Sequence, residues 1–254
     1  MRLKVGLGVV CFVATLLVAG AEGAPPAAVT QAINLDSDPH LVGWWKLGET
    51  AGQTAADSSA QKHDGTLEGG LSFDTHSVAG RSGRALKFNG GESSLRIAGF
   101  KGIAGTRPRT VAAWIKTASA SGEIVSWGRN EHGQMWIFGH TRGGLGVTPG
   151  GGYLYMKPGH ADNAWHHVAA VVRDAALPNL HDDVKLYKDG EPAEIDDIGL
   201  LDLWPIETGQ MLDVRIGQRW AGLISDLRIY DRGLSDEEIK ALFSAPCRGP
   251  AAKP

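Results

Sequence analysis

The stretch WAGLISDLRIYDRGLSDEEIKALF, residues 220–243, decides the fold more than any other part of the chain. Its first part, Leu223–Tyr230, is rich in β-branched, aromatic and other apolar residues, and the even-numbered spacing of Leu223, Leu227 and Ile229 predicts a β-strand with one buried face. Its second part predicts a helix, because Ser235 can cap the first turn while Glu238, three residues on, completes a capping box. A closing strand followed by a short capped helix is therefore expected.

From residue 41 to this stretch the chain follows a different pattern, with short runs of β-branched and aromatic residues separated by clusters of Gly, Asn, Asp and Ser. The 35 glycines suit a chain with many tight turns. This pattern predicts an all-β fold, an antiparallel two-sheet β-sandwich (jelly roll) with one short C-terminal helix. The expected strands are 41–47, 85–88, 95–97, 110–116, 123–127, 134–140, 153–156, 165–173, 184–188, 214–216 and 223–230.

Five segments resemble, in order, parts of the laminin G-like (concanavalin A-like lectin/glucanase) domain family. The opening GWWKLGETAGQTAADSSAQKHDGTL resembles its first strand and loop, ALKFNGGESSLRI its next hairpin, and TVAAWIKT its central strand. WHHVAAVVRD with VKLYKDGE resembles its long paired strands, and residues 220–243 its closing strand and helix. The resemblance places one domain at 41–244 and implies that its first and last strands pair in one sheet.

The first 24 residues predict a cleaved signal peptide. Arg2 and Lys4 precede an apolar run that is too short to cross a bilayer, and small residues follow it up to Ala24. The alternative is an uncleaved membrane anchor. We therefore expect a secreted protein, or one in the periplasm or cell envelope, with a linker at 25–40 and a Pro-containing tail at 245–254.

Charge and cysteine content limit the partners. The chain has 25 Lys and Arg against 28 Asp and Glu, without basic runs, which argues against nucleic acid and against stable insertion of the mature chain into membranes. The two cysteines are Cys11, in the signal segment, and Cys247, in the tail. An internal disulfide is therefore not expected, and Cys247 is left as a free thiol or an intermolecular bridge.

The sequence gives no support for catalysis. Glucanases of the resembling superfamily place alternating acidic residues on one strand, in an E-x-D-x-x-E pattern. The nearest fragment here, EPAEIDDIG at 191–199, lacks the final glutamate and is expected to be a solvated loop. Motifs for serine hydrolases, zinc proteases and phosphate binding are also absent from the sequence. We therefore predict that the protein is not an enzyme.

Calcium is the one cofactor that the resemblance implies. In resembling domains an ion joins the first and last strands, and Glu49 and Asp226 match its two acidic ligands, with main-chain oxygen near Gly90 as a further ligand. Regular alternation along the last strand is expected to direct Asp226 away from the core. The alternative is an ordinary ion pair between Arg228 and one of these carboxylates.

Aromatic and polar residues in the middle of the domain and its loops are the candidates for ligand binding. Sugar rings stack on flat aromatic faces while neighbouring polar groups bond their hydroxyls. Buried packing is the alternative role for each aromatic residue. The candidates are Arg129, Asn130, His132, Trp136, His140, Tyr153, Tyr155 and Trp204.

Taken together, these patterns predict a secreted, non-enzymatic recognition module whose partner is a glycan or an extracellular protein. Carbohydrate binding, assisted by calcium, is the first expectation. Protein–protein adhesion and a structural role in an envelope or matrix are the alternatives. Glycoside hydrolysis comes last, because the paired carboxylates that it requires have no match in the sequence.

Overall fold

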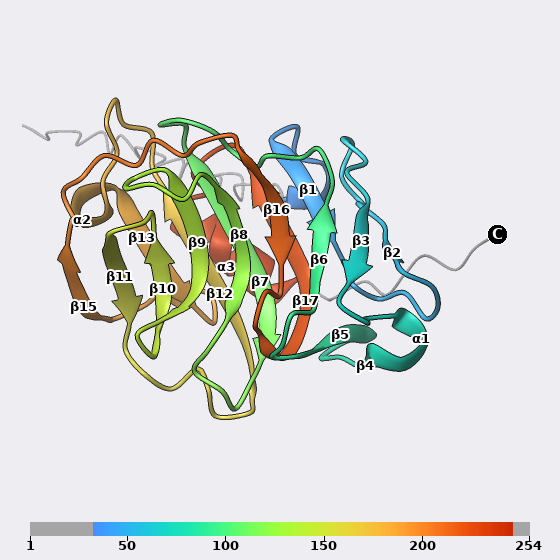
Figure 1. The fold of residues 1–254 in the computed structure, drawn as a ribbon. Coiled ribbons are helices and arrows are strands. Elements are labelled where there is room, and N and C mark those ends of the chain that lie inside the picture. The colour runs from blue at the N-terminus through green and yellow to red at the C-terminus, as the bar shows by residue number, and fades with distance from the viewer. Residues whose placement is uncertain (1–32, 246–254) are drawn as a thin grey trace, which may run out of the picture. The chain divides into compact units, whose positions relative to one another are not determined.

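Two antiparallel β-sheets stack face to face in the part of the chain that the structure describes, residues 33–245 of a computed structural model (Figure 1). The sandwich predicted from sequence is therefore confirmed. We call the eight-stranded sheet the back sheet and the nine-stranded sheet, nearer the viewer in Figure 1, the front sheet. The signal-peptide prediction and Cys247 lie outside the described residues.

The back sheet has seven strands in one path and an eighth that pairs with the central strand β17. The path is β14 (Glu191–Pro192), β13 (Val184–Lys188), β12 (Trp165–Val172), β7 (Arg109–Lys116), β17 (Ala221–Tyr230), β5 (Arg84–Asn89) and β4 (Ser77–Ala79), with β1 (Leu41–Trp45) beside β17.

The front sheet contains nine strands, several of them short. Their order is β15 (Ile195–Leu200), β11 (Gly152–Met156), β10 (Gly144–Thr148), β9 (Met135–Thr141), β8 (Glu123–Gly128), β16 (Leu212–Ile216), β6 (Ser94–Ile97), β3 (Gly65–Glu68) and β2 (Thr54–Ala55). Four helical turns join or flank the sheets, namely the 3-10 helix η1 (Leu35–Ser37), α1 (Phe73–His76), α2 (Leu180–Asp183) and α3 (Asp236–Ser244).

The main core fills the space between the sheets. Alternate residues of most strands enter it, such as Leu154 and Met156 of β11 and Val111 and Ala113 of β7. Arg109, at the start of β7, is fully buried, and it donates hydrogen bonds to the carbonyl oxygens of residues 103, 105 and 107. Burial lowers its pKa to about 9.

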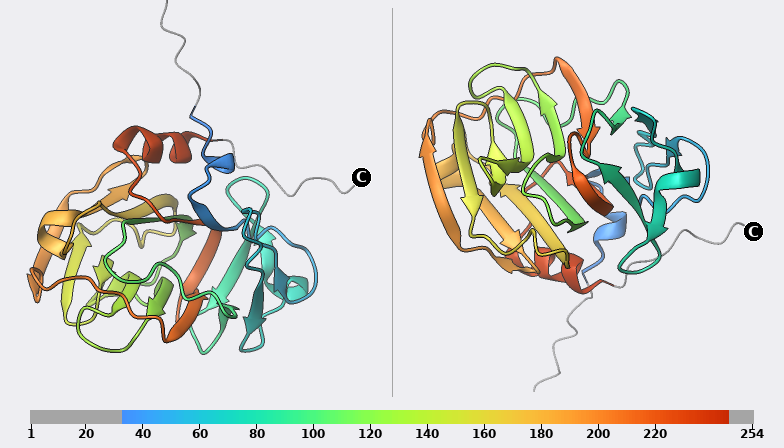
Figure 2. Two further views of the ribbon diagram at one scale, coloured as in Figure 1. Left: turned by 90° about the horizontal axis from the view of Figure 1, so that it is seen from above. Right: turned by 60° about the horizontal axis from the view of Figure 1, so that its bottom comes forward.

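A second apolar cluster covers the outer face of the back sheet. It joins outward-facing residues of β1, β7, β12, β13 and β17 to η1 and α3, which lie across this sheet (Figure 2). Because β12 is buried on both faces, seven of its eight residues are buried and its sequence is an almost continuous apolar run. The cluster consists of Leu35, Leu41, Trp44, Ala112, Ala169, Val171, Tyr187, Tyr230, Leu234, Ile239 and Leu242.

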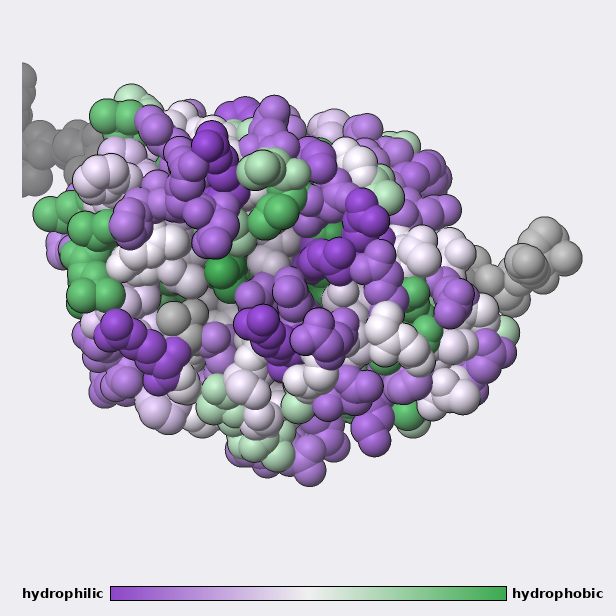
Figure 3. Space-filling view, in the orientation of Figure 1, coloured by the Kyte–Doolittle hydropathy of each residue, from purple (hydrophilic) through white to green (hydrophobic). Residues whose placement is uncertain are grey.

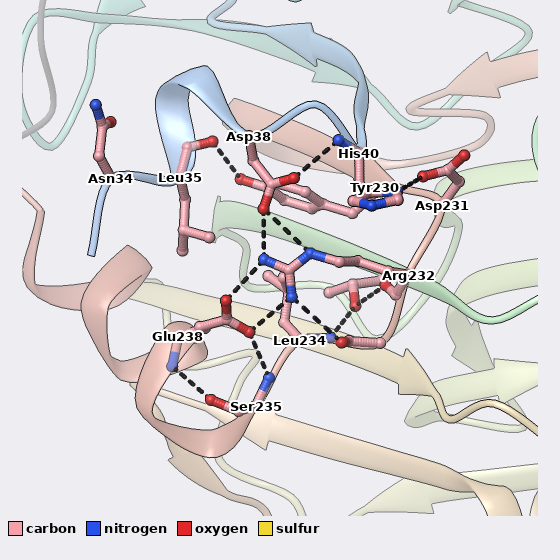
Figure 4. A network of polar contacts seen from close by, with 12 residues as sticks. Asn34, Leu35, Asp38, His40, Tyr230, Asp231, Arg232, Leu234, Ser235 and Glu238 are labelled. Carbon is pink, nitrogen blue, oxygen red and sulfur yellow. Dashed lines mark hydrogen bonds and ion pairs between the residues drawn. The ribbon is translucent and has the colours of Figure 1, made fainter.

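Polar contacts hold α3 and η1 on this sheet (Figure 4). The capping box predicted at Ser235 and Glu238 is present, with both reciprocal hydrogen bonds. Glu238 also pairs with Arg232 at 2.7 Å, and Arg232 reaches across to Asp38, which lies just after η1. This ion-pair network joins the two ends of the domain.

The first and last strands pair as the resemblance implied. β1 and β5 lie on the same side of β17, and β17 pairs with β5 through residues 221–224 and with β1 through 227–230. Between these halves the register against β7 shifts, and Asp226 has a positive φ of 49°. The expected unbroken alternation is therefore wrong, because the irregularity places Ile224 in the core instead of Leu223.

Two boundary regions differ from expectation. The end of the expected linker, residues 33–40, packs on the domain, where Leu35 is buried and Asp36 pairs with Arg228 at 2.7 Å. Residues 195–200, expected as a loop, form the edge strand β15, because β11 supplies a pairing partner that the local pattern does not reveal. No helix within residues 33–245 has the length and apolar character needed to span a membrane.

Candidate ligand-binding site

The outer face of the front sheet is not covered by any of the helices in the described part of the chain (Figures 1 and 3). In Figure 3 it is a mosaic of hydrophilic, neutral and apolar residues, with apolar residues gathered at the left margin over β15. Side chains on this face alternate with those that enter the core. This face is therefore the one where ligand-binding side chains can be displayed.

Tyr153 and Tyr155 form a stacked pair on this face, with ring centroids 4.6 Å apart and ring planes 9° apart. They project outward because Leu154, between them, enters the core. A Cβ at Gly144 would lie 2.6 Å from the Tyr155 ring, so only glycine gives this ring room to lie over β10. Tyr153 is partly exposed, whereas Tyr155 is buried beneath its neighbours.

Charged groups lie beside the tyrosine pair. The guanidinium of Arg142 is 5.1 Å from the centre of the Tyr153 ring, and Asp197 of β15 lies opposite Tyr155 in the strand register. Desolvation, together with Asp197, raises the pKa of Tyr153. The Tyr153 hydroxyl therefore stays protonated at neutral pH and can both donate and accept a hydrogen bond.

Ion pairs occupy the other half of the same face, which is formed by β3, β6 and β16. Asp213 of β16 accepts hydrogen bonds from Lys101 and Arg96, each with a contact of 2.6 Å, and these cations lower its pKa to about 2. Glu68 of β3 pairs with Arg215 at 2.7 Å. Because these charges neutralise one another, the half formed by β3, β6 and β16 has fewer free polar groups for a ligand than the tyrosine half.

A hollow of about 570 Å³ opens at the adjoining loop end of the front sheet. It lies between the β8–β9 loop and the β10–β11 turn, and its lining residues are Asn130, Glu131, His132, Gln134, Gly150 and Gly151. Arg129 is beside it and pairs with Glu131 at 2.6 Å. Trp204, in the connection from β15 to β16, is not a lining residue, but it lies against Gly133, between the lining residues His132 and Gln134, where a Cβ would lie 2.7 Å from the indole ring. Three predicted ligand residues are therefore in or beside the hollow, and Trp204 contacts the same loop.

Two of the predicted ligand residues are placed elsewhere. Trp136 is fully buried and packs against Trp127 at a centroid distance of 6.0 Å, so its predicted exposure to a ligand is wrong. His140 lies at the opposite end of β9, where its ring stacks on Trp220 at 5.1 Å and makes a tilted contact with His160 at 5.0 Å. Burial lowers the pKa of His140 to about 4. Both side chains point inward from β9. The sequence pattern alone could not distinguish inward-facing from outward-facing aromatic residues.

The three predicted calcium ligands do not form one site. Asp226 accepts a hydrogen bond from the indole N–H of Trp44 and pairs with Arg228 at 3.2 Å, as in the ion-pair alternative. The amide of Gly90 donates a hydrogen bond to the carbonyl oxygen of Trp220. Trp220 precedes Asp226 by six residues, which corresponds to about 20 Å of extended strand. Gly90 therefore lies far from Asp226.

Glu49 binds the amide of Ala56 through one oxygen, at 2.9 Å, and its other carboxylate oxygen is buried without a hydrogen-bond partner. That oxygen is the one feature that suits a cation. Within residues 33–245, no three His, Cys, Asp or Glu side chains cluster closely enough to hold a metal ion. Calcium binding stays a prediction.

The two-sheet sandwich agrees with a match between residues 89–240 and a family model described as concanavalin A-like lectin/glucanases. The chain belongs to the concanavalin A-like lectin/glucanase superfamily. No curated protein sequence matches it significantly.

Solved structures share this lectin/glucanase fold. Domain 4 of AbnA, a GH43 extracellular arabinanase from Geobacillus stearothermophilus solved with arabinotriose, is 20% identical with a TM-score of 0.56, over 80% of this chain and 98% of that one. The binding domain of Paraclostridial Mosquitocidal Protein 1 is 16% identical with a TM-score of 0.52, over 80% and 52%. Trypanosoma rangeli sialidase is 15% identical with a TM-score of 0.50, over 80% and 32%. These similarities establish the fold alone.

The sequence predicted Tyr153, Tyr155 and Trp204 together with Arg129, Asn130 and His132, but it did not predict four of their polar neighbours. Arg142 and Asp197 come from a turn and an edge strand whose positions depend on strand pairing. Glu131 and Gln134 were missed although they flank the predicted His132 in sequence. Their loop position between two expected strands was the available signal.

Proposed function

We propose that this protein is a secreted, non-enzymatic carbohydrate-binding module and that its glycan lies on the tyrosine half of the front sheet. The observation that carries this proposal is the stacked pair Tyr153 and Tyr155 on a sheet face that the described helices leave uncovered. Domain 4 of AbnA, which has the same fold over nearly its whole length, was solved with arabinotriose.

The chemistry of the face suits a sugar. The C–H groups of a pyranose or furanose ring pack on aromatic surface, while its hydroxyls need donors and acceptors nearby. Tyr153 supplies both ring surface and a protonated hydroxyl, Arg142 supplies donors, and Asp197 supplies acceptors. A neutral glycan with vicinal hydroxyls is therefore the class of ligand that these residues match.

On the tyrosine half of the front sheet, where the glycan is proposed to lie, the spacing of two acidic groups supports a non-enzymatic role. Glu123 and Asp197 lie in one cross-strand row of the uncovered face, through Gly139, Gly146 and Tyr155. They are four strands apart, which corresponds to about 19 Å at the usual strand spacing. Glycoside hydrolases need two carboxyl groups about 5 to 9.5 Å apart. This pair is therefore too widely separated to hydrolyse a glycosidic bond.

Protein adhesion is the second candidate function, and one observation favours it. Large apolar side chains are exposed near the loop end and β15, which is unusual for a surface that faces only water. They are Leu177, Leu200, Leu203 and Trp204, with exposed fractions between 51% and 64%.

The decisive experiment measures retention of the mature protein on a panel of insoluble polysaccharides, followed by a glycan array. We expect retention on at least one polysaccharide, its loss in Tyr153→Ala, and partial retention in Tyr153→Phe, which keeps the ring but not the hydroxyl. Arg215→Ala, on the ion-paired half of the face, is the matched control and should bind normally. Retention that survives Tyr153→Ala would contradict the proposed face, and capture of a protein partner without glycan binding would favour adhesion.

Calcium assistance is a separate proposal that rests on the unpartnered oxygen of Glu49. An ion that binds the folded state alone would stabilise it by about 2.7 kcal/mol at 100 times its Kd. We therefore expect chelation to lower the melting temperature of the protein and not that of Glu49→Gln. Equal melting with calcium and with chelator would exclude a bound ion.

A further inference from the structure

We infer that the hollow beside Trp204 is a second sugar subsite, so that the ligand of this protein is a linear glycan chain and not a single sugar. The inference rests on the proposed function and specifies its ligand class. The two subsites would be the tyrosine pair on the front sheet and the hollow at its loop end, which the turn 149–151 and the start of β11 connect.

Trp204 displays its ring to solvent. Its side chain is 51% exposed, whereas those of Trp45, Trp127, Trp136 and Trp220 are fully buried. The indole lies against Gly133, in a left-handed conformation with φ of 73°, and a side chain at that position would displace the ring. The main chain beside Gly133 is also fixed, because the amide of residue 207 binds the Gly133 carbonyl at 2.9 Å. The local backbone therefore holds an exposed aromatic ring against Gly133, which lies between the lining residues His132 and Gln134 in sequence.

The hollow supplies the polar groups that an adjacent sugar would need. Asn130 and His132 are exposed, and neither side chain makes a hydrogen bond to another group within residues 33–245. Glu131 is held in place by Arg129 at 2.6 Å and by the side-chain amide of Gln134 at 3.2 Å. An amide, an imidazole and an oriented carboxylate thus surround a space large enough for a sugar ring.

The hollow and the tyrosine pair are close to each other along the chain. Gly151 lines the hollow, close enough to the His132 ring that a Cβ there would lie 2.7 Å from it. Tyr153 follows only two residues later in β11, about 7 Å along the strand. Because Trp204 and Tyr153 lie on different elements at the two ends of this path, one sugar ring cannot stack on both. A chain of several sugars can place one unit on each ring.

Chain length is therefore expected to control affinity. Once one sugar occupies the tyrosine subsite, the next units of the same chain are presented to the hollow at high effective concentration. Binding of a hexasaccharide should exceed that of the matching disaccharide by more than tenfold, a difference of about 1.4 kcal/mol per factor of ten. A protein with a single subsite would show little dependence on length beyond the sugars that fill it.

The test uses the full chain and calorimetric titration with arabino-, xylo- and cello-oligosaccharides, each as disaccharide and hexasaccharide. We expect Trp204→Ala to remove the preference for the hexasaccharide while disaccharide binding persists and still depends on Tyr153. Leu203→Ala, which replaces the exposed neighbour of Trp204, is the matched control and should keep the wild-type preference. Circular dichroism checks that each variant is folded.

The outcomes separate the two claims. If Trp204→Ala keeps the full length preference while Tyr153→Ala abolishes binding, the second subsite is overturned and the proposed function stands. The second subsite is also overturned if the wild-type protein binds disaccharide and hexasaccharide equally. If no oligosaccharide binds the wild-type protein and none of the insoluble polysaccharides retains it, the proposed function itself fails.

Discussion

The two sheets of this sandwich bury equivalent inner faces, but their outer faces differ completely. The outer face of the back sheet is sealed by η1 and α3 over an apolar cluster, whereas that of the front sheet has no helix over it in the described residues. On the front sheet, stacked tyrosines and paired charges occupy positions that are apolar and buried on the back sheet. One outer face is therefore covered by apolar packing, whereas the other is uncovered and carries the proposed glycan-binding residues.

Removing the cover of the back sheet should have the largest effect. A chain ending at Asp231 lacks α3 and exposes the apolar cluster beneath it, so we expect it to aggregate or remain unfolded. A chain ending at Ala245 keeps every described residue and is the control. The milder change Ile239→Ala should lower the free energy of unfolding by about 2 to 5 kcal/mol. Circular dichroism, gel filtration and urea denaturation measure these effects, and a soluble, folded chain ending at Asp231 would contradict the proposed division.

Acid should weaken the back sheet through His167. This ring is buried against Trp114 and Phe243 of α3, and burial lowers its pKa to about 4, against about 6.5 in the unfolded chain. Between these values only the unfolded state binds the proton, so the free energy of unfolding falls as the pH decreases, by up to about 3 kcal/mol. Urea denaturation from pH 7 to 4 measures this slope. His167→Phe should reduce it, and an unchanged slope would show that other groups are responsible.

The ion pairs of the two outer faces should differ in strength. Arg232 joins Asp38 and Glu238 beside the sealed face, and Arg232→Met should lower the free energy of unfolding by about 1 to 3 kcal/mol. The matched change Arg215→Met breaks the more exposed pair with Glu68 and should cost less than about 1 kcal/mol. Both are measured by urea denaturation. Equal losses would mean that the two networks stabilise the fold equally.

The smallest effect on stability is expected on the proposed binding face. Tyr153→Ala removes a partly exposed ring and should change the free energy of unfolding by less than about 1 kcal/mol. Trp136→Ala, on the core side of β9, should cost about 3 to 5 kcal/mol because that ring is fully buried. Thermal and urea denaturation compare the two. A large loss in Tyr153→Ala would place the tyrosine pair among the residues that stabilise the fold.

Structural features that depend on residues close together in sequence were predicted correctly. Ser235 and Glu238 are three residues apart and cap α3 as expected. Predictions were wrong where the environment of a residue depends on strands that are distant in sequence. Trp136 and Tyr155 both lie in short aromatic runs, but the first faces the core and the second the uncovered face. Residues 195–200 became a strand because β11 lies beside them, which their own sequence does not indicate.

The sandwich, the strand periodicity and the closing helix can be predicted from the amino-acid sequence alone, because apolar patterning and helix capping act over a few residues. Which outer face is sealed depends on where η1 and α3 pack, so it follows from the assembled fold and not from the sequence. The same holds for Asp226, because the irregularity in β17 turns that side chain toward Trp44 and Arg228. Burial and charge pairing are set by neighbours from distant parts of the chain, and these meet only when the sheets assemble.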